Sequence, residues 1–130
     1  MIDSTRTHKR DEGKARHSFI PPKALEEVAK VLTDGAVKYS PYSWTKVESS
    51  RYLDATLRHL NQTRDGDNKD AESGLSHLAH AITNLMFLLE RELDKSGLLG
   101  APLQSFTTEV VRAWEGAGKV SRKGIADELY

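Results

Sequence analysis

The stretch SGLSHLAHAITNLMFLL, residues 73–89, constrains the fold more than any other part of the chain. At about 3.6 residues per turn, a helix here places seven apolar side chains on one face, which predicts a face packed in a core. These residues are Leu75, Leu78, Ala79, Ile82, Leu85, Met86 and Leu89. His77, His80 and Asn84 form a second stripe on the opposite side. Apolar residues flank this stripe too, so we expect both faces of the helix to be buried.

Two segments ahead of this one also carry the spacing of amphipathic helices, over residues 20–39 and 51–64. Pro22 suits the first turn of the earlier helix, where a missing N–H costs no hydrogen bond. A shorter fourth helix is predicted over residues 103–114, and no segment alternates as a strand would. The expected buried residues are Leu25, Val28, Leu32, Ala36 and Tyr39 in the first helix and Leu53, Leu57 and Leu60 in the second. We therefore predict an all-α fold, a small helical bundle.

Length and charge narrow the class of protein further. The 130 residues suffice for one domain, and we expect a flexible charged arm over 1–17, a helical domain over 18–95, and a C-terminal helix and tail over 96–130. Basic and acidic residues balance at 19 each, which argues against nucleic-acid binding. No apolar run reaches the roughly 18 residues of a membrane span, and no apolar signal region opens the chain. With no cysteine either, we expect a cytoplasmic protein without disulfides, thiolate metal sites or membrane contact.

Histidines form the first candidate site. His59 lies on the second predicted helix, and His77 and His80 lie on the third. The short acidic turn between these helices predicts that they are antiparallel neighbours. Facing imidazoles bind metal ions through neutral nitrogens. They also occur in cores, bonded to backbone or to acids, and the sequence leaves both interpretations open.

Acidic residues crowd the turn before the third helix. They are Asp65, Asp67, Asp70 and Glu72. Carboxylate oxygens are the ligands that Mg²⁺ prefers, but negative charge at a helix N-terminus is also favoured by the helix dipole. The same two interpretations apply to Glu26 and Glu27 at the start of the first helix.

Cations and aromatic rings supply candidates for nucleotide binding. Arg51 and Arg58 are seven residues apart and share a helix face, where guanidinium groups either grip phosphate or form a solvated surface. Lys14 precedes the first helix and Lys38 ends it. The rings of Tyr39 and Trp44, beside the first connection, either stack on a base or close the core.

In combination these motifs resemble the phage dATP/dGTP diphosphohydrolase family, a MazG-like branch of the all-α nucleoside triphosphate pyrophosphatases. The matching segments are GKARHSFIPPKALEEVAKVLTDGAVKYSPYSW, RYLDATLRHL and DAESGLSHLAHAITNLMFLL, so the resemblance covers about residues 13–90. It implies a MazG-like bundle, a homo-oligomer (dimer or tetramer), and Mg²⁺- or Mn²⁺-dependent cleavage of purine deoxynucleoside triphosphates between the α and β phosphates. In phages that use 2-aminoadenine, such enzymes supply dGMP to the modified-base pathway and remove dATP.

The resemblance also implies a set of site residues. We assign catalysis to Glu27, Arg58, His59 and His80, substrate binding to Lys14, Lys38, Tyr39, Trp44, Arg51 and Asn84, and metal binding to Asp70, Glu72 and His77. The chain departs from the family pattern at the metal ligands, because MazG enzymes use ExxE on one helix and ExxD on the next. Here the third-helix slot reads His77-Leu-Ala-His80, and the second helix has no ExxE. The turn acids, Glu26 or Glu27, and the histidines all remain open as ligands.

Two other functions remain as alternatives. The chain lacks a P-loop, so it is not a Walker-type NTPase. One alternative is another metal-dependent phosphohydrolase with His59, His77, His80 and a carboxylate as ligands. The other is a non-catalytic interaction module whose third helix is a dimer seam.

Overall fold

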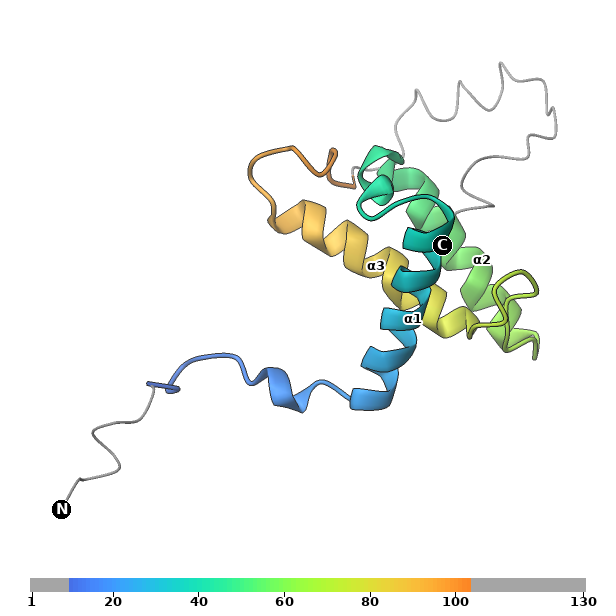
Figure 1. Ribbon diagram of the computed structural model, residues 1–130, viewed down its shortest axis with the longest axis horizontal. Helices are drawn as coiled ribbons and strands as arrows, with labels where there is room; N and C mark the ends of the chain where they lie inside the picture. The colour runs from blue at the N-terminus through green and yellow to red at the C-terminus, as the bar shows by residue number, and fades with distance from the viewer. Residues whose placement is uncertain (1–9, 104–130) are drawn as a thin grey trace.

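The computed structural model describes residues 10–103, which form three α-helices and two short 3-10 helices (Figure 1). The elements in order are η2 (His17–Phe19), α1 (Pro22–Lys38), η3 (Ser43–Lys46), α2 (Ser49–Arg64) and α3 (His77–Leu93). Within the described residues the only strand-like feature is an isolated bridge between Lys69 and Ser76. The all-α prediction is confirmed for this part. The predicted fourth helix over 103–114, the tail after it and residues 1–9 of the predicted arm lie outside the described residues.

The three helices form a small bundle around α3. This helix packs along α2 in the antiparallel sense expected from the short connection, and it also packs against α1 (Figure 1). Residues 10–19 extend away from the bundle in the same view. None of the helices in residues 10–103 has both the length and the apolar character needed to cross a membrane.

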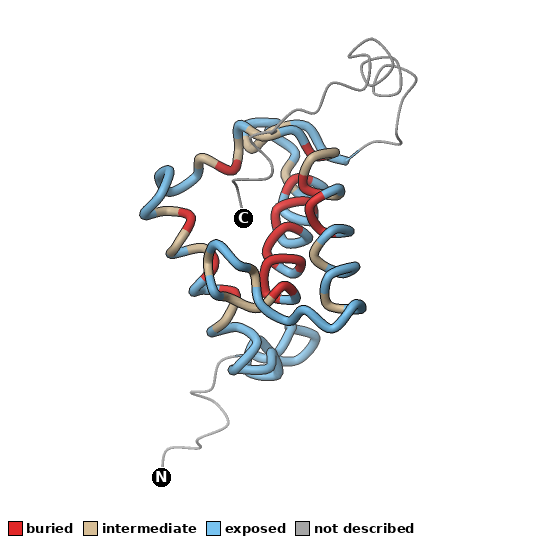
Figure 2. The backbone as a smooth tube through the Cα atoms, turned by 90° about the vertical axis from the view of Figure 1, so that its right-hand side faces the viewer, coloured by how far each residue is buried: buried red, intermediate tan, exposed pale blue. Residues whose placement is uncertain are grey.

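The core lies where the helices face each other (Figure 2). Its buried members come from all three helices and from η3: Val31, Trp44, Tyr52, Ala79, Phe87 and Leu88. Trp44 and Phe87 stack with ring centroids 4.4 Å apart and planes 7° from parallel, and Tyr52 packs against Phe87 at 5.1 Å. The prediction that Pro22 opens the first helix is confirmed, since it occupies the first turn of α1.

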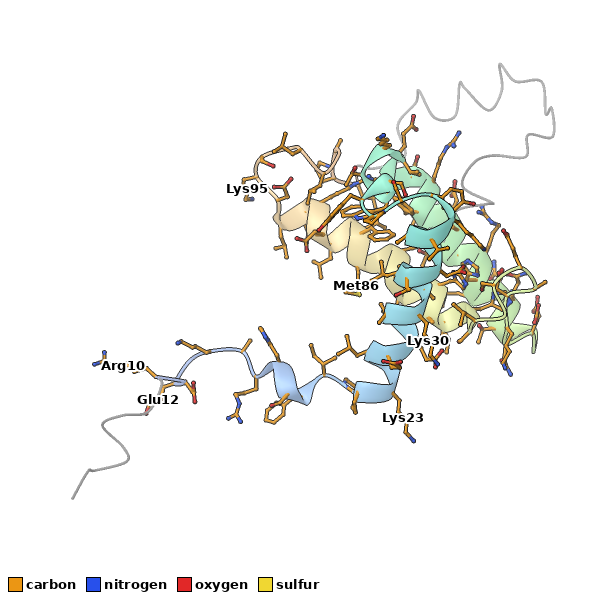
Figure 3. The ribbon with its side chains drawn as sticks, viewed as in Figure 1. Arg10, Glu12, Lys23, Lys30, Met86 and Lys95 are labelled. Carbon is orange, nitrogen blue, oxygen red and sulfur yellow. The ribbon has the colours of Figure 1, made fainter. Side chains whose placement is uncertain are left out.

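The face of α3 that packs inward is the polar stripe together with Ala79, so the predicted burial of this stripe is confirmed and that of most of the apolar face is not. His77, His80 and Asn84 are buried, whereas the predicted core face is 40–52% exposed at Leu78, Ile82, Leu85, Met86 and Leu89. Met86 lies on the outer side of the helix, away from α2 (Figure 3). The expectation that both faces are buried is therefore wrong for the described residues, because α1 and α2 cover only one side of α3.

The predicted faces of the other two helices are confirmed only in part. Leu57 and Leu60 of α2 are about half exposed, and the smaller Ala55 and Thr56 are buried in their place, while the predicted Leu53 packs against the core. In α1, the predicted Val28 is buried and Leu32 packs against the core, whereas Leu25, and Tyr39 just after the helix, are exposed. Periodicity finds an apolar stripe, but which stripe meets a neighbour depends on contacts far along the chain.

Arg91, near the end of α3, forms hydrogen bonds with three other segments at this end of the bundle. Its guanidinium is only 1% exposed and donates to Leu99 O at 2.8 Å, Ser49 Oγ at 2.9 Å and Trp44 O at 3.0 Å. Burial lowers its pKa below the usual value, although nearby Tyr52 opposes that shift. No carboxylate of residues 10–103 forms a salt bridge with it, so neutral oxygens and the rings of Trp44 and Tyr52 hold the charge.

Candidate functional site

Three imidazoles meet where α2 and α3 pack together. His59 Nδ1 of α2 lies 2.8 Å from His77 Nδ1, in the first turn of α3. The His59 ring also stacks on His80, with centroids 4.8 Å apart and planes 13° from parallel. Both α3 histidines are buried and His59 is half-buried. The sequence prediction that histidines of neighbouring helices face each other is confirmed.

The loop between α2 and α3 brings a carboxylate to these rings. Asp70 N–H donates to Leu75 O and Gly74 N–H to Asp70 O, both at 2.8 Å, so the chain folds back on itself before the helix. Gly74 has a φ of 72°, a left-handed conformation that glycine adopts without a side-chain penalty. The helix then begins at His77, with Ser76 as N-cap. This start is later than predicted, and Asp70 lies in the turn before the helix, as predicted.

Ser73 links this carboxylate to the third histidine. Its backbone N–H donates to Asp70 Oδ2 at 2.8 Å, and its Oγ lies 2.7 Å from His80 Nε2. Partial burial raises the pKa of the Asp70 carboxyl, but the hydrogen bonds from Ser73 and the nearby His80 and His59 outweigh it, so the pKa lies below its usual value. Asp70 therefore carries a full negative charge at neutral pH.

Two polar groups of this face lack hydrogen-bond partners among the described residues. Asn84 is fully buried, one turn after His80, and neither Oδ1 nor Nδ2 of its amide has one. His77 Nε2 is also buried without a hydrogen bond, although Asp67 Oδ2 lies 3.3 Å away. Buried polar groups are normally satisfied, so the unpaired amide of Asn84 points to a missing ligand, whereas His77 Nε2 has the Asp67 carboxylate beside it.

The cluster has the donors that a divalent cation needs. His59, Asp70 and His77 each offer one ligand atom, and these atoms lie within 4.8 Å of one another. Two neutral imidazoles and one carboxylate supply a single negative charge and three ligands, leaving coordination positions open. A divalent cation therefore matches these side chains in charge, and the two nitrogen donors favour an ion that accepts imidazole ligands.

The third predicted metal ligand, Glu72, lies in a different contact. Its Oε1 is 3.5 Å from Lys38 Nζ, which is also 3.2 Å from Asp34 Oδ2. Burial lowers the pKa of Lys38, but Asp34 and Glu72 raise it by more. Glu72 thus connects the last turn of α1 to the loop that carries Asp70, and through this contact Lys38 lies at the same end of the bundle as that loop.

The other assigned residues lie at different distances from the cluster. Arg58 is exposed on α2 next to His59, and Arg51 is half-buried two turns earlier on the same face. Glu27 pairs with Lys30 at 3.0 Å on α1, and Lys14 lies in the exposed segment ahead of that helix. Neither of these two joins the hydrogen bonds of the cluster within the described residues.

The two aromatic residues assigned to substrate binding, Trp44 and Tyr39, lie in different environments. The Trp44 ring is buried against Phe87 under the Arg91 guanidinium, so it closes the core. Phe87 is ten residues after His77, which is roughly 15 Å along a helix, so the structure does not bring Trp44 to the histidines. Tyr39, 39% exposed after the last turn of α1, is the accessible ring of the two.

Sequence reasoning missed two contributors to the cluster. It counted Asp67 as one of four turn acids without relating it to His77, and it gave Ser73 no role. Ser73 is seven residues before His80, a separation that has no meaning until the turn at Gly74 folds the loop back. Nothing in the local pattern could have identified it.

The fold and the cluster define an all-α protein with a histidine–carboxylate site between two antiparallel helices. The chain belongs to the dATP/dGTP diphosphohydrolase family, since the family model described as "dATP/dGTP diphosphohydrolase, N-terminal" matches residues 4–98. A protein of Salmonella phage PMBT28, named dATP/dGTP diphosphohydrolase, is 44% identical over 78 residues, which cover 60% of this chain and 27% of that protein. The match thus spans only about a quarter of the phage protein. No solved structure gives a significant match.

Proposed function

We propose that this chain is the helical catalytic domain of a metal-dependent diphosphohydrolase. It cleaves dGTP and dATP between the α and β phosphates to the monophosphate and pyrophosphate. The family membership and the name of the phage relative support the substrate class. The observation that carries a catalytic role is the grouping of His59, Asp70 and His77 near buried polar atoms that have no hydrogen-bond partner within the described residues.

The residues around the cluster have different proposed roles in the reaction. A bound divalent cation would supply an activated water and offset charge on the phosphates. His80 is held by Ser73 and by the His59 ring, so its orientation is set before a substrate arrives. Arg58, exposed beside His59, and Arg51 on the same face are the proposed phosphate clamps.

The last turn of α1 is the proposed site for the nucleoside end of the substrate. Lys38 is held there by Asp34 and Glu72, and Tyr39 follows it with an accessible ring. A purine offers a larger stacking surface than a pyrimidine, which is consistent with the preference named for the family. Asn84 is the proposed buried contact of the pocket, because its amide has both a donor and an acceptor without hydrogen-bond partners in the described part of the chain.

Self-association is part of the proposal. The exposed leucines, isoleucine and methionine of α3 recur along the whole helix and form an apolar strip, whose exposure to water is unfavourable. A second copy of the chain is the occupant that the family resemblance favours, as a dimer or tetramer. We place the protein in the host cytoplasm, where it would act on the nucleotide pool, and in a phage with 2-aminoadenine DNA its dGMP would feed that pathway.

Product analysis tests the proposal directly. The purified chain is incubated with each of the four deoxynucleoside triphosphates and with Mg²⁺ or Mn²⁺, and the phosphorus products are resolved. We expect pyrophosphate, released faster from dGTP and dATP than from the pyrimidine nucleotides. Tripolyphosphate or orthophosphate would instead indicate a different phosphohydrolase, and equal rates for all four would contradict purine selectivity. Failure to turn over any substrate would favour the interaction module.

A further inference from the structure

We infer that His59, His77 and Asp70 form a site that binds a borderline transition ion, of the Co²⁺ or Zn²⁺ kind, in preference to Mg²⁺. In this site Asp67 is a positioning residue that orients His77. The inference rests on the proposed function for its location only, because ion binding is measured without nucleotide.

The two imidazoles have the spacing of ligands to a single ion. The Nδ1 atoms of His59 and His77 are 2.8 Å apart. Two nitrogens that bind one ion at about 2.1 Å, in neighbouring coordination positions, lie roughly 3 Å apart. The separation therefore already matches a pair of ligands. Without an ion, the same separation requires one nitrogen to donate a proton to the other.

A carboxylate lies behind His77, on the side of the ring away from His59. Asp67 Oδ2 lies 3.3 Å from Nε2, the nitrogen on the far side of the ring from His59. A carboxylate at this nitrogen favours the tautomer with the proton on Nε2, which leaves the Nδ1 lone pair directed at His59. A histidine ligand backed by a carboxylate is the usual outer-shell arrangement of protein metal sites.

The donor atoms of the cluster are not the ones that Mg²⁺ prefers. Mg²⁺ binds oxygen ligands in near-ideal octahedra and retains several waters, and this cluster offers one carboxylate. Imidazole nitrogens favour later first-row ions, whose affinity rises from Mn²⁺ through Co²⁺. His77 is 1% exposed, so its nitrogen cannot easily be replaced by water. The cluster should therefore bind Mg²⁺ weakest, Mn²⁺ next and Co²⁺ more tightly.

Direct ion binding tests this order. The full chain is prepared without a histidine tag and stripped with a chelator. Mg²⁺, Mn²⁺ and Co²⁺ are then titrated by calorimetry, and Co²⁺ also by its visible absorption. The chain has no cysteine, so thiolate bands cannot obscure the spectrum. We expect one Co²⁺ per chain, bound at least about 100-fold more tightly than Mg²⁺.

Matched variants locate the site. We expect His59→Gln and Asp70→Asn each to weaken Co²⁺ binding by roughly 100-fold, whereas the exposed controls His17→Gln and Asp65→Asn bind as the parent does. Asp67→Asn should weaken binding by about 10–100-fold and alter the Co²⁺ spectrum, and Asp67→Glu should restore part of the affinity. His59 and Asp70 are half-buried, and circular dichroism checks that each variant is folded. If one is unfolded, the other carries the test.

Several results would overturn the inference. Mg²⁺ binding within tenfold of Co²⁺ would do so, as would Co²⁺ binding that survives unchanged in both His59→Gln and Asp70→Asn. Failure of the proposed function is distinguishable. A chain that binds Co²⁺ as described but hydrolyses no nucleotide keeps the metal site and loses the activity. A variant in which these side chains are replaced and which still cleaves dGTP with Mg²⁺ keeps the activity and loses the metal site.

Discussion

Replacing Asn84 with leucine should stabilise the fold and abolish turnover together. Asn84 is fully buried, and both polar atoms of its amide lack hydrogen-bond partners among residues 10–103. Each unpaired buried group costs about 1–3 kcal/mol, so removing two sets an upper limit of roughly 2–6 kcal/mol. Leucine has a similar volume but a different shape, and misfit in a packed site costs about 1–3 kcal/mol. We therefore expect a net gain of about 2 kcal/mol, which raises Tm by roughly 5–10 °C in a chain of this length.

The neighbouring Thr83 provides the matched control. It is equally buried, but its hydroxyl donates to Ala79 O at 2.8 Å. Thr83→Val removes a satisfied group, so stability should be unchanged or fall by about 1 kcal/mol. Thermal and urea denaturation of both variants measure this difference in sign. Turnover of dGTP measures the second half of the prediction, because a retained, destabilising amide indicates contact with a ligand.

Two outcomes would refute this reasoning. If Asn84→Leu lowers Tm as much as Thr83→Val or more, the amide has partners in the folded protein and its role is structural. If Asn84→Leu raises Tm and leaves turnover unchanged, the amide is unpaired but lies outside the pocket.

Three further perturbations follow from other parts of the structure. Arg91→Lys keeps the charge but loses at least two of three buried hydrogen bonds, so urea denaturation should show that the free energy of unfolding falls by about 2–4 kcal/mol. The control Arg64→Lys, at an exposed position, should leave that free energy almost unchanged. Leu85→Lys, on the exposed strip of α3, should reduce the mass found by light scattering while leaving helix content intact, and a monomeric parent protein would contradict this. Hydrogen bonds from Ser96 lower the pKa of Asp94 below its usual value of 3.8, so its stabilising effect is complete above about pH 4 and disappears as the pH falls through the lowered pKa. Ser96→Ala should weaken that acid dependence in denaturation curves, and an unchanged curve would exclude the contact.

Local sequence signals predicted the elements of this fold well. Pro22 opens α1, the three periodic segments within residues 10–103 become helices, and the short acidic turn makes α2 and α3 antiparallel neighbours. These features depend on residues a few positions apart. The meeting of His59 with His77 followed from the same reasoning, because a short turn between two helices fixes which ends face each other.

The choice of buried face and the details of the cluster could not be predicted in this way. In α3 an apolar strip and a polar stripe compete, and the ring of His59 and the loop at Ser73 settle the outcome by partnering the polar stripe. The contacts of Asp67 with His77 and of Ser73 with His80 depend on how twelve loop residues, 65–76, fold back. Trp44 was assigned to substrate binding or to the core, and only its stack on Phe87 decides for the core.

The buried guanidinium of Arg91 also bears on the order in which the chain folds. Its partners lie 42 and 47 positions earlier in the sequence and 8 positions later, so it is satisfied only when η3, the start of α2 and the segment after α3 have all come together. Contacts between distant segments form late, after the entropy of closing the intervening loops has been lost. Removing Arg91 should therefore accelerate unfolding far more than it slows refolding, which makes this residue a determinant of how long the native state persists.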